Sequence, residues 1–361
     1  MKLCIINMIA WLFSSVSKRF GLVKKLFLKR MIRLSKINFK IAASAKYVPA
    51  MKVSNDDLTR LVETDDAWIH SRTGIKTRYI STGENTSDLC ACVASALIEK
   101  AGISPLEVNA VIVSTVTPDY LTPSTACIVQ GKIGASNAFA FDVNAACAGF
   151  VYALDVGSRF VETGKYTMII SGDVLSKITD WADRATCVLF GDGAGGILIT
   201  QTEEERGMIA SELQADGAGY GIITGGHMPV ANAFTEQNDS KRFEPFVLMQ
   251  GRGVNDFVRR DVTKSIDVVL QKAGLTVQDI KYIVPHQANA RLIEVLAKKT
   301  GVPIDKFYIN IEEYANTSSS SIPIALDEMY EKGIIKNGSG DILLFSGFGA
   351  GFVLGNAVVR I

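Results

Sequence analysis

Short β-branched runs alternate along the chain with longer segments whose apolar residues recur at helical spacing. From residue 37 onward, this pattern predicts strands at Ile37–Ala43, Val108–Thr115, Ala138–Val143, Thr167–Ser171, Gly196–Thr200, Gly207–Leu213, Tyr282–Val284, Phe307–Asn310 and Asp341–Phe345. Helices are predicted at Thr86–Ala101, Ser124–Gly131, Cys147–Thr163, Gly253–Ala273, Ala290–Thr300 and Ser320–Lys332. Buried strands alternating with helices are typical of an α/β fold.

The first and second halves of this pattern resemble each other. Three pairs of segments correspond: Asn109–Val113 with Lys281–Val284, Cys147–Leu154 with Ser318–Ala325, and Ile169–Gly172 with Leu344–Gly347. We therefore expect an internal duplication, with one half spanning residues 37–201 and the other residues 202–361. Corresponding loops of two such halves meet at a central seam, and a site built from both would lie there.

The first 36 residues stand apart from this body. Ten of the 38 basic residues lie within the first forty positions, which contain no acidic residue, so the remainder carries 28 basic and 37 acidic side chains. The segment Ser17–Arg30 has a basic amphipathic pattern, and Met31 offers an internal start. Three interpretations stay open for residues 1–36: sequence dispensable for the working protein, an interfacial membrane helix, or a targeting peptide. We prefer the first.

Composition narrows the function classes. Apolar residues make up 48% of the chain and charged residues 21%, which is typical of a globular protein. The acidic body argues against nucleic acid as a partner, and no apolar run is long enough for a transmembrane helix. Six scattered cysteines and three histidines have no metal-site spacing, so we expect no metal, and reduced thiols indicate the cytoplasm.

Cys147 is the most informative position. It follows a predicted strand and a turn of small residues, and it opens an apolar helix. A thiol at a helix N-terminus lies at the positive end of the helix dipole, which favours the thiolate, and the free N–H groups there can hold an oxyanion. A buried structural cysteine is the alternative at this position. We interpret the cysteines within predicted helices and strands as structural: Cys90, Cys92, Cys127 and Cys187.

Two further residues carry candidate chemistry in the second half. His286 lies at the end of a predicted strand, where sites of open α/β sheets form, although a lone histidine is more often structural. Asn316 lies in a polar turn before a helix, where its ordinary role would be a cap. The glycine run Gly347–Phe352 ends a strand and lets the backbone approach a ligand closely.

Taken together, these residues closely resemble 3-oxoacyl-(acyl-carrier-protein) synthase III, the initiating condensing enzyme of type II fatty-acid synthesis. The matching segments occur in the right order over residues 37–361: Asp65–Ile75, the Cys147 turn, Leu189–Gly195, Pro285–Asn289, Asn316–Ser318 and the glycine run. The resemblance implies a thiolase-like fold of two duplicated α/β halves in five α-β-α-β-α layers, and a homodimer.

The resemblance also implies a mechanism. Cys147 takes an acyl primer from acyl-CoA, and malonyl-acyl carrier protein then loses carbon dioxide while His286 and Asn316 stabilise the enolate oxygen. The backbone N–H groups of Cys147 and Ala350 would form the oxyanion hole. No cofactor is implied, because the CoA thioester is a substrate and phosphopantetheine is carried by the acyl carrier protein.

Substrate-binding positions follow from the same resemblance. The implied CoA-binding residues are Trp68, Arg72, Arg184, Gly251 and Asn289. Arg291 would dock the acidic carrier protein, and Thr122 and Phe348 would line the acyl pocket. Because Thr122 is small where bulk from the partner subunit can limit primer length, we expect a roomier pocket.

Departures from the family pattern leave alternatives. Alanine replaces glycine at Ala315 and Ala350, Asn255 replaces an aromatic residue and Leu354 a tryptophan. A methyl group at position 350 restricts φ > 0, so the loop geometry there is in question. The rivals are a related acyl-CoA condensing enzyme, such as one of secondary metabolism, and a catalytically weak acyl-binding homologue. A biosynthetic thiolase would need a second catalytic cysteine, and none follows Cys187.

Overall fold

Two β-sheets form the frame of the described part of the chain. The structure is a computed structural model that describes residues 38–230, 232, 234 and 243–361, so the basic segment 1–36 lies outside the described residues. The first sheet has the order β1 (Phe39–Tyr47), β7 (Gly193–Gln201), β6 (Tyr166–Asp173), β4 (Val108–Ser114) and β5 (Phe139–Val143). The second has the order β8 (Gly207–Ala215), β13 (Val353–Arg360), β12 (Ile342–Gly349) and β11 (Tyr282–Pro285).

The two sheets repeat one topology. In each sheet, the edge strand pairs antiparallel with the second strand, and the second pairs antiparallel with the third. The third strand then pairs parallel with the fourth. The parallel neighbour β5 of the first sheet corresponds in the second to a single parallel bridge between Ile283 and Phe307. This shared order and direction agree with the expected duplication.

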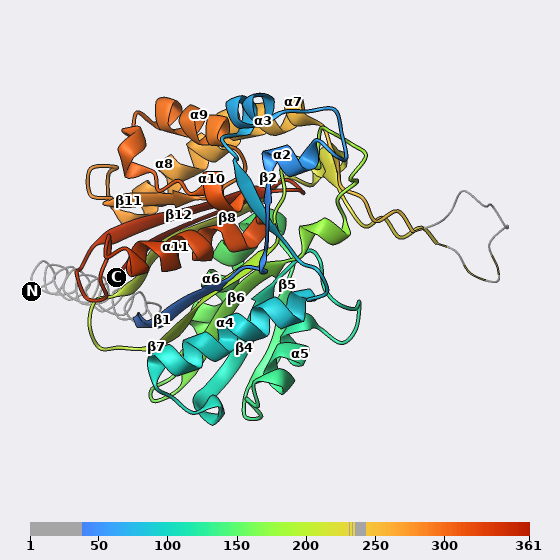
Figure 1. The fold of residues 1–361 in the computed structure, drawn as a ribbon. Helices are drawn as coiled ribbons and strands as arrows, with labels where there is room; N and C mark the ends of the chain where they lie inside the picture. The colour runs from blue at the N-terminus through green and yellow to red at the C-terminus, as the bar shows by residue number, and fades with distance from the viewer. Residues whose placement is uncertain (1–37, 231, 233, 235–242) are drawn as a thin grey trace, which may run out of the picture. The chain divides into compact units, whose positions relative to one another are not determined.

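Helices cover the sheets in five layers, α-β-α-β-α (Figure 1). The outer helices on the first sheet are α4 (Thr86–Ala101) and α5 (Thr125–Lys132), and those beyond the second are α8 (Thr263–Ala273) and α9 (Ala290–Thr300). Between the sheets lie α6 (Gly149–Gly157), which contacts strands of both, and α11 (Ser321–Glu331), which contacts β1, β7 and β11. The expected thiolase-like arrangement is confirmed.

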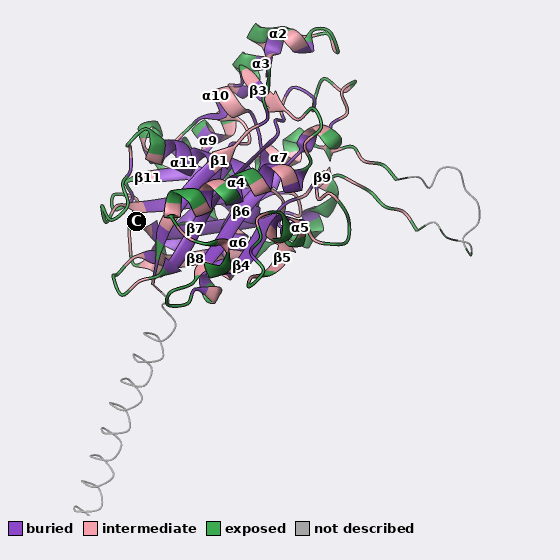
Figure 2. Cartoon of the chain, turned by 60° about the horizontal axis from the view of Figure 1, so that its bottom comes forward, coloured by how far each residue is buried: buried purple, intermediate pink, exposed green. Residues whose placement is uncertain are grey.

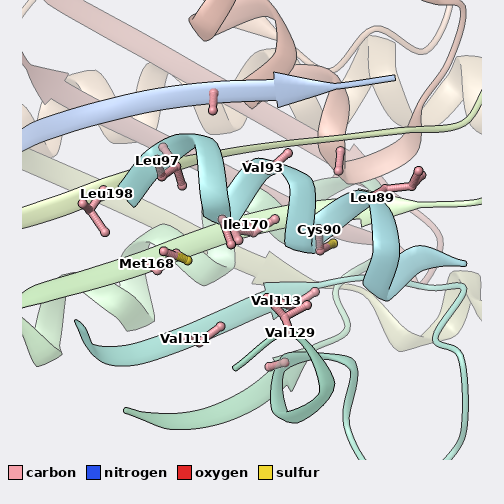
Figure 3. Close-up of a cluster of buried hydrophobic side chains, with 14 of the residues drawn as sticks. Leu89, Cys90, Val93, Leu97, Val111, Val113, Val129, Met168, Ile170 and Leu198 are labelled. Atoms are coloured by element: carbon pink, nitrogen blue, oxygen red, sulfur yellow. The ribbon is translucent and has the colours of Figure 1, made fainter. Parts of the chain in front are cut away.

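Burial follows this layering. The central helix α11 is buried along nearly its whole length, Ile322–Met329 included, whereas the outer helix α4 buries one face, as Figure 2 shows. On α4 the buried residues Leu89, Val93 and Leu97 recur every four positions and belong to the cluster between this helix and β1, β6 and β7 (Figure 3). A helix between two sheets is enclosed on all sides, so the Asp327 carboxylate of α11 needs its partners Ser44, Lys46 and Lys100. A helix that faces solvent needs only an apolar stripe.

Smaller elements complete the molecule. Two hairpin-like pairs are β2 (Met51–Ser54) with β3 (Thr77–Ile80) and β9 (Ile223–Thr224) with β10 (Leu248–Met249). The remaining α-helices of the described residues are α2 (Asn55–Leu58), α3 (Asp66–Thr73), α7 (Gly251–Phe257) and α10 (Ile311–Tyr314). Among the described residues, no helix is both long and apolar enough to cross a membrane.

Three predicted elements differ from the structure. The helix predicted over 147–163 is a 3-10 turn, Ala146–Ala148, followed by α6 and a second 3-10 turn. The predicted helix 253–273 begins at Gly251 and contains a π-helical segment, Val258–Val262. The predicted strand 307–310 is reduced to its one bridge, and β13 is an additional strand that pairs antiparallel with β12 on one side and β8 on the other.

Candidate active site

One cavity of about 840 Å³ opens at the seam between the two halves. Cys147 lines it after β5, His286 after β11, and Asn316 after α10. The loop between β12 and β13, residues 349–353, closes another side. The structure therefore brings the three candidate catalytic residues to one space, as the sequence predicts.

The turn that carries Cys147 is held by very close backbone contacts. A Cβ on Gly349 would lie 2.7 Å from the Cys147 nitrogen, and a Cβ on Gly347 would lie 2.8 Å from the Ala148 Cα. Only glycine fits at both positions, which explains the glycine run. Ala146, directly before the cysteine, has φ 44°, a strained value for a residue with a side chain.

The ionisation state of Cys147 differs from the local prediction. Burial raises the pKa of its thiol to about 12, although a hydrogen bond with Ser318, Sγ to Oγ 3.5 Å, acts in the opposite direction. The helix-dipole argument predicts a thiolate, and the structure holds a neutral thiol because desolvation of the charged form outweighs the local stabilisation. Attack on a thioester therefore requires that the thiol proton be removed.

His286 is fully enclosed and neutral. Its Nδ1 lies 2.8 Å from the Ser321 hydroxyl, and its ring meets the Phe348 ring edge to face at 5.4 Å. Burial lowers the pKa of His286 to about 3. The Ser321 hydroxyl has one proton, and it also lies 2.9 Å from the Ser318 carbonyl. With that proton on the Nδ1 contact, the proton of the neutral ring is on Nε2, the tautomer that can donate to a substrate oxygen, and with it on the carbonyl contact the ring proton is on Nδ1.

Asn316 is fixed by hydrogen bonds on its backbone and its side chain. Its N–H donates to Leu189 O and its carbonyl accepts from Gly191 N, both at 3.0 Å. The side-chain Oδ1 accepts from the Ser318 N–H at 2.9 Å. With its oxygen engaged in this way, the amide offers Nδ2 as a donor.

The other predicted site residues divide into two groups. Lining the same cavity are Arg72, Gly251, Asn289, Arg291, Phe348 and Ala350. Trp68, Arg184 and Thr122 do not line it, and the exposed Thr122 lies before α5. Trp68 instead contacts two guanidinium groups, Arg72 and Arg184, each with its central carbon 4.6 Å from the ring centroid. These three side chains form one aromatic–cationic stack.

The sequence predicts no role for three polar residues near the site: Asp173, Ser318 and Ser321. In a run of four serines, nothing local tells which hydroxyl faces the cysteine and which the histidine, because the fold sets those directions. Asp173 ends an apolar strand, and its burial was not expected of a carboxylate. Among the described residues, no group of three or more His, Cys, Asp or Glu side chains could hold a metal ion.

Known proteins are similar to this chain in both sequence and fold. A family model described as 3-oxoacyl-[acyl-carrier-protein] synthase III matches residues 141–217, and a second model, for the C-terminal part of that family, matches residues 270–361. A beta-ketoacyl-[acyl-carrier-protein] synthase III of Clostridium acetobutylicum is 47% identical over 323 residues, covering 89% of this chain and 98% of its own. One from Streptococcus uberis is 46% identical over 89% of this chain and 99% of its own. The solved synthase III of Aquifex aeolicus aligns with TM-score 0.81 and 36% identity over 90% of this chain and all of its own.

The chain belongs to the 3-oxoacyl-[acyl-carrier-protein] synthase III family. It is accordingly an acyltransferase of the condensing type that initiates type II fatty-acid synthesis. The relatives do not favour the rival assignments to secondary metabolism or to mere acyl binding.

The two alanines that depart from the synthase III pattern have different consequences. Ala350 does not have a positive φ, so the expected conflict between its methyl group and the loop does not arise, and the positive φ in this loop, 140°, is at Gly351. Ala315 has φ 57° and ψ −158°, a region that is essentially restricted to glycine. The strain therefore lies at Ala315, directly before Asn316.

Ala315→Gly is expected to stabilise the protein by about 1 kcal/mol, because relief of the backbone strain exceeds the lost methyl burial and the added chain entropy. Urea unfolding of the two proteins at one pH measures this difference. An unchanged or lower free energy of unfolding for the glycine variant would show that Ala315 is not strained.

His286 is expected to make the fold sensitive to mild acid. Its pKa is about 3 in the folded protein and ordinarily 6.5, so between these values the unfolded chain binds a proton that the folded chain does not. Folding stability therefore falls as the pH falls below 6.5, by about 1.4 kcal/mol per pH unit from this residue. Urea unfolding at pH 6.5 and pH 5 should show a smaller loss for His286→Gln than for the unsubstituted protein, and equal losses would contradict the assignment.

Proposed function

We propose that this chain transfers an acyl primer from acyl-CoA to Cys147 and condenses it with malonyl-acyl carrier protein. The products are 3-oxoacyl-acyl carrier protein, carbon dioxide and CoA. The observation that carries this proposal is the convergence of Cys147, His286 and Asn316, from both halves of the chain, on one cavity. We place the reaction in the cytoplasm, with no resident cofactor.

In the first half-reaction, the Cys147 sulfur attacks the thioester carbonyl of acyl-CoA and CoA leaves with its sulfur. The carbonyl oxygen becomes negative in the transition state, and backbone N–H groups of Cys147 and Ala350 would stabilise it. The close packing of Gly349 on the cysteine turn supports this arrangement.

In the second half-reaction, malonyl-acyl carrier protein loses carbon dioxide and leaves an enolate. His286 Nε2 and Asn316 Nδ2 would donate to the enolate oxygen, and the hydrogen bonds that both groups make on their other atoms orient them for this. The low pKa of His286 keeps the ring neutral, so it acts as a hydrogen-bond donor rather than as a cation. The enolate carbon then attacks the acyl-cysteine.

Substrate entry uses the basic side of the cavity. We propose that Arg72, Gly251 and Asn289 contact the CoA chain, since they line the cavity, and that Asn289 also fixes Arg72 by donating to its carbonyl at 3.1 Å. Trp68 and Arg184 would bind the adenine ring of CoA, which would insert between these two stacked side chains. Arg291 at the cavity would dock the acidic carrier protein.

The acyl pocket is proposed to be completed by a second copy of the chain. Thr122 is exposed and lies outside the cavity of its own chain, so it can limit primer length only across a homodimer. Thr122→Phe is expected to reduce turnover of branched and longer primers at least about tenfold relative to acetyl-CoA, because added bulk excludes the extra methylenes. Competition between acetyl-CoA and branched primers measures this ratio, and strict acetyl preference of the unsubstituted enzyme would contradict the roomier pocket.

The proposed function is tested by supplying the full chain with acetyl-CoA and malonyl-acyl carrier protein and analysing the carrier protein by mass spectrometry. We expect 3-oxoacyl-acyl carrier protein. Replacing malonyl-acyl carrier protein by acetyl-CoA or malonyl-CoA as the second substrate should give little product. Efficient condensation with a free CoA thioester alone would favour a related condensing enzyme instead.

A further inference from the structure

A carboxylate is buried behind Cys147 without a cationic partner. Asp173, at the end of β6, has no exposed surface and forms no ion pair within the described part of the chain. Its Oδ1 accepts from Val116 N at 2.8 Å, from Thr115 Oγ1 at 2.9 Å and from Thr117 Oγ1 at 3.2 Å. Its Oδ2 accepts from Ser319 Oγ at 3.1 Å. A buried carboxylate that only neutral groups satisfy is uncommon and calls for a reason.

Ser318 links this carboxylate to the nucleophile. Its hydroxyl oxygen accepts from the Cys147 thiol, with Sγ and Oγ 3.5 Å apart, and the same side chain lies near enough to Asp173 to lower the pKa of that carboxyl. Ser318 has φ 54°, so the backbone is held in a sparsely populated conformation at the residue that touches both groups. Such strain is concentrated at functional positions.

The proton balance of the reaction requires such a group. The thiol of Cys147 is neutral, since burial raises its pKa to about 12, and it must lose a proton when it attacks. His286 is a poor acceptor, because burial lowers its pKa to about 3. Burial raises the pKa of Asp173, which makes that carboxylate a better proton acceptor than an exposed one.

We propose that the Ser318 hydroxyl passes the Cys147 proton to Asp173 during acyl transfer and returns it after condensation. This inference rests on the proposed function and concerns its first half-reaction. As the Sγ–carbonyl bond forms, the thiol proton moves to Ser318 Oγ and the Ser318 proton moves to Asp173, while the electron pair of the broken bond leaves with the CoA sulfur, which takes a proton from solvent. When the enolate displaces Cys147, the sulfur leaves as thiolate and regains its proton from Asp173 through Ser318.

Adjacent serines provide a matched pair of variants. Ser319 donates to Asp173 at 3.1 Å and does not contact the thiol, whereas Ser318 contacts the thiol and lowers the pKa of Asp173. In single-turnover acetylation of the full chain by acetyl-CoA, Ser318→Ala should slow acyl transfer about a hundredfold, the range expected for loss of proton transfer. Ser319→Ala should change it by less than about fivefold, as expected for one neutral hydrogen bond. Decarboxylation of malonyl-acyl carrier protein should stay within the same fivefold limit in both, which also shows that the variants fold.

Two further readouts separate a relay from a structural contact. In mixtures of H2O and D2O, the acetylation rate of the unsubstituted protein should depend on deuterium content with curvature, because two protons move, and Ser318→Ala should lose the curvature. Asp173→Asn should slow acetylation as much as Ser318→Ala, and the double variant should be no slower. Equal rates for Ser318→Ala and the unsubstituted protein, or equal losses for Ser318→Ala and Ser319→Ala, would overturn the relay alone. Absence of acetylation in the unsubstituted protein would instead overturn the proposed function.

Discussion

Cys147→Ala is expected to lose at least about a thousandfold in 3-oxoacyl-acyl carrier protein formation, because no other group can carry the acyl primer. The side chain is the one thiol that faces the cavity beside His286 and Asn316 among the described residues. The alanine fits the turn, since Ala146 and Ala148 flank it, so the fold should be retained. Steady-state product formation from acetyl-CoA and malonyl-acyl carrier protein measures the loss.

Cys92→Ala is the matched control for this variant. Cys92 is an exposed free thiol on α4, away from the cavity, and its removal should leave the rate unchanged. If both alanine variants kept their activity, the acyl group would not pass through Cys147. A loss in the Cys92 variant alone would likewise be incompatible with the assignment.

His286→Ala and Asn316→Ala are expected to separate the two half-reactions. Each removes one donor to the enolate oxygen, which should reduce decarboxylation and condensation by about a hundred- to a thousandfold. Acetylation of Cys147 should change by less than about fivefold, because neither group is needed to form the acyl-enzyme. Carbon dioxide release from malonyl-acyl carrier protein and acetyl incorporation measure the two steps independently.

Asn316→Asp tests whether the amide acts as a donor. Aspartate has the same shape, but it lacks the Nδ2 donor and places negative charge beside the enolate, so its decarboxylation rate should be at least as low as that of Asn316→Ala. If the aspartate variant retained its rate, or if acetylation fell together with decarboxylation, Asn316 would not act in the way we propose.

Sequence patterns predicted which candidate catalytic residues meet in the cavity, because each of them follows a local rule. Cys147, His286 and Asn316 all lie near junctions between secondary-structure elements, and such junctions meet at the seam of a duplicated α/β fold. The outer helices α4 and α9 have the predicted bounds, because a one-sided apolar stripe and a capping residue are both readable from the chain.

The remaining features depend on contacts between distant segments. The neutral state of Cys147 reflects burial by the second half of the chain, which outweighs the local effect of the helix terminus. The separate roles of Ser318 and Ser321 depend on hydroxyl directions that the fold alone sets. For the same reason, no pattern in the sequence indicates that Asp173 is buried.

The most direct test of the central claim follows one acetyl group through the site. The full-length protein is mixed with acetyl-CoA, and peptide mass spectrometry locates the acetyl group before and after malonyl-acyl carrier protein is added. We predict one acetyl group per chain on Cys147, which disappears as 3-oxoacyl-acyl carrier protein forms. An unlabelled Cys147, or a label on Cys147 that malonyl-acyl carrier protein does not discharge, would contradict the account.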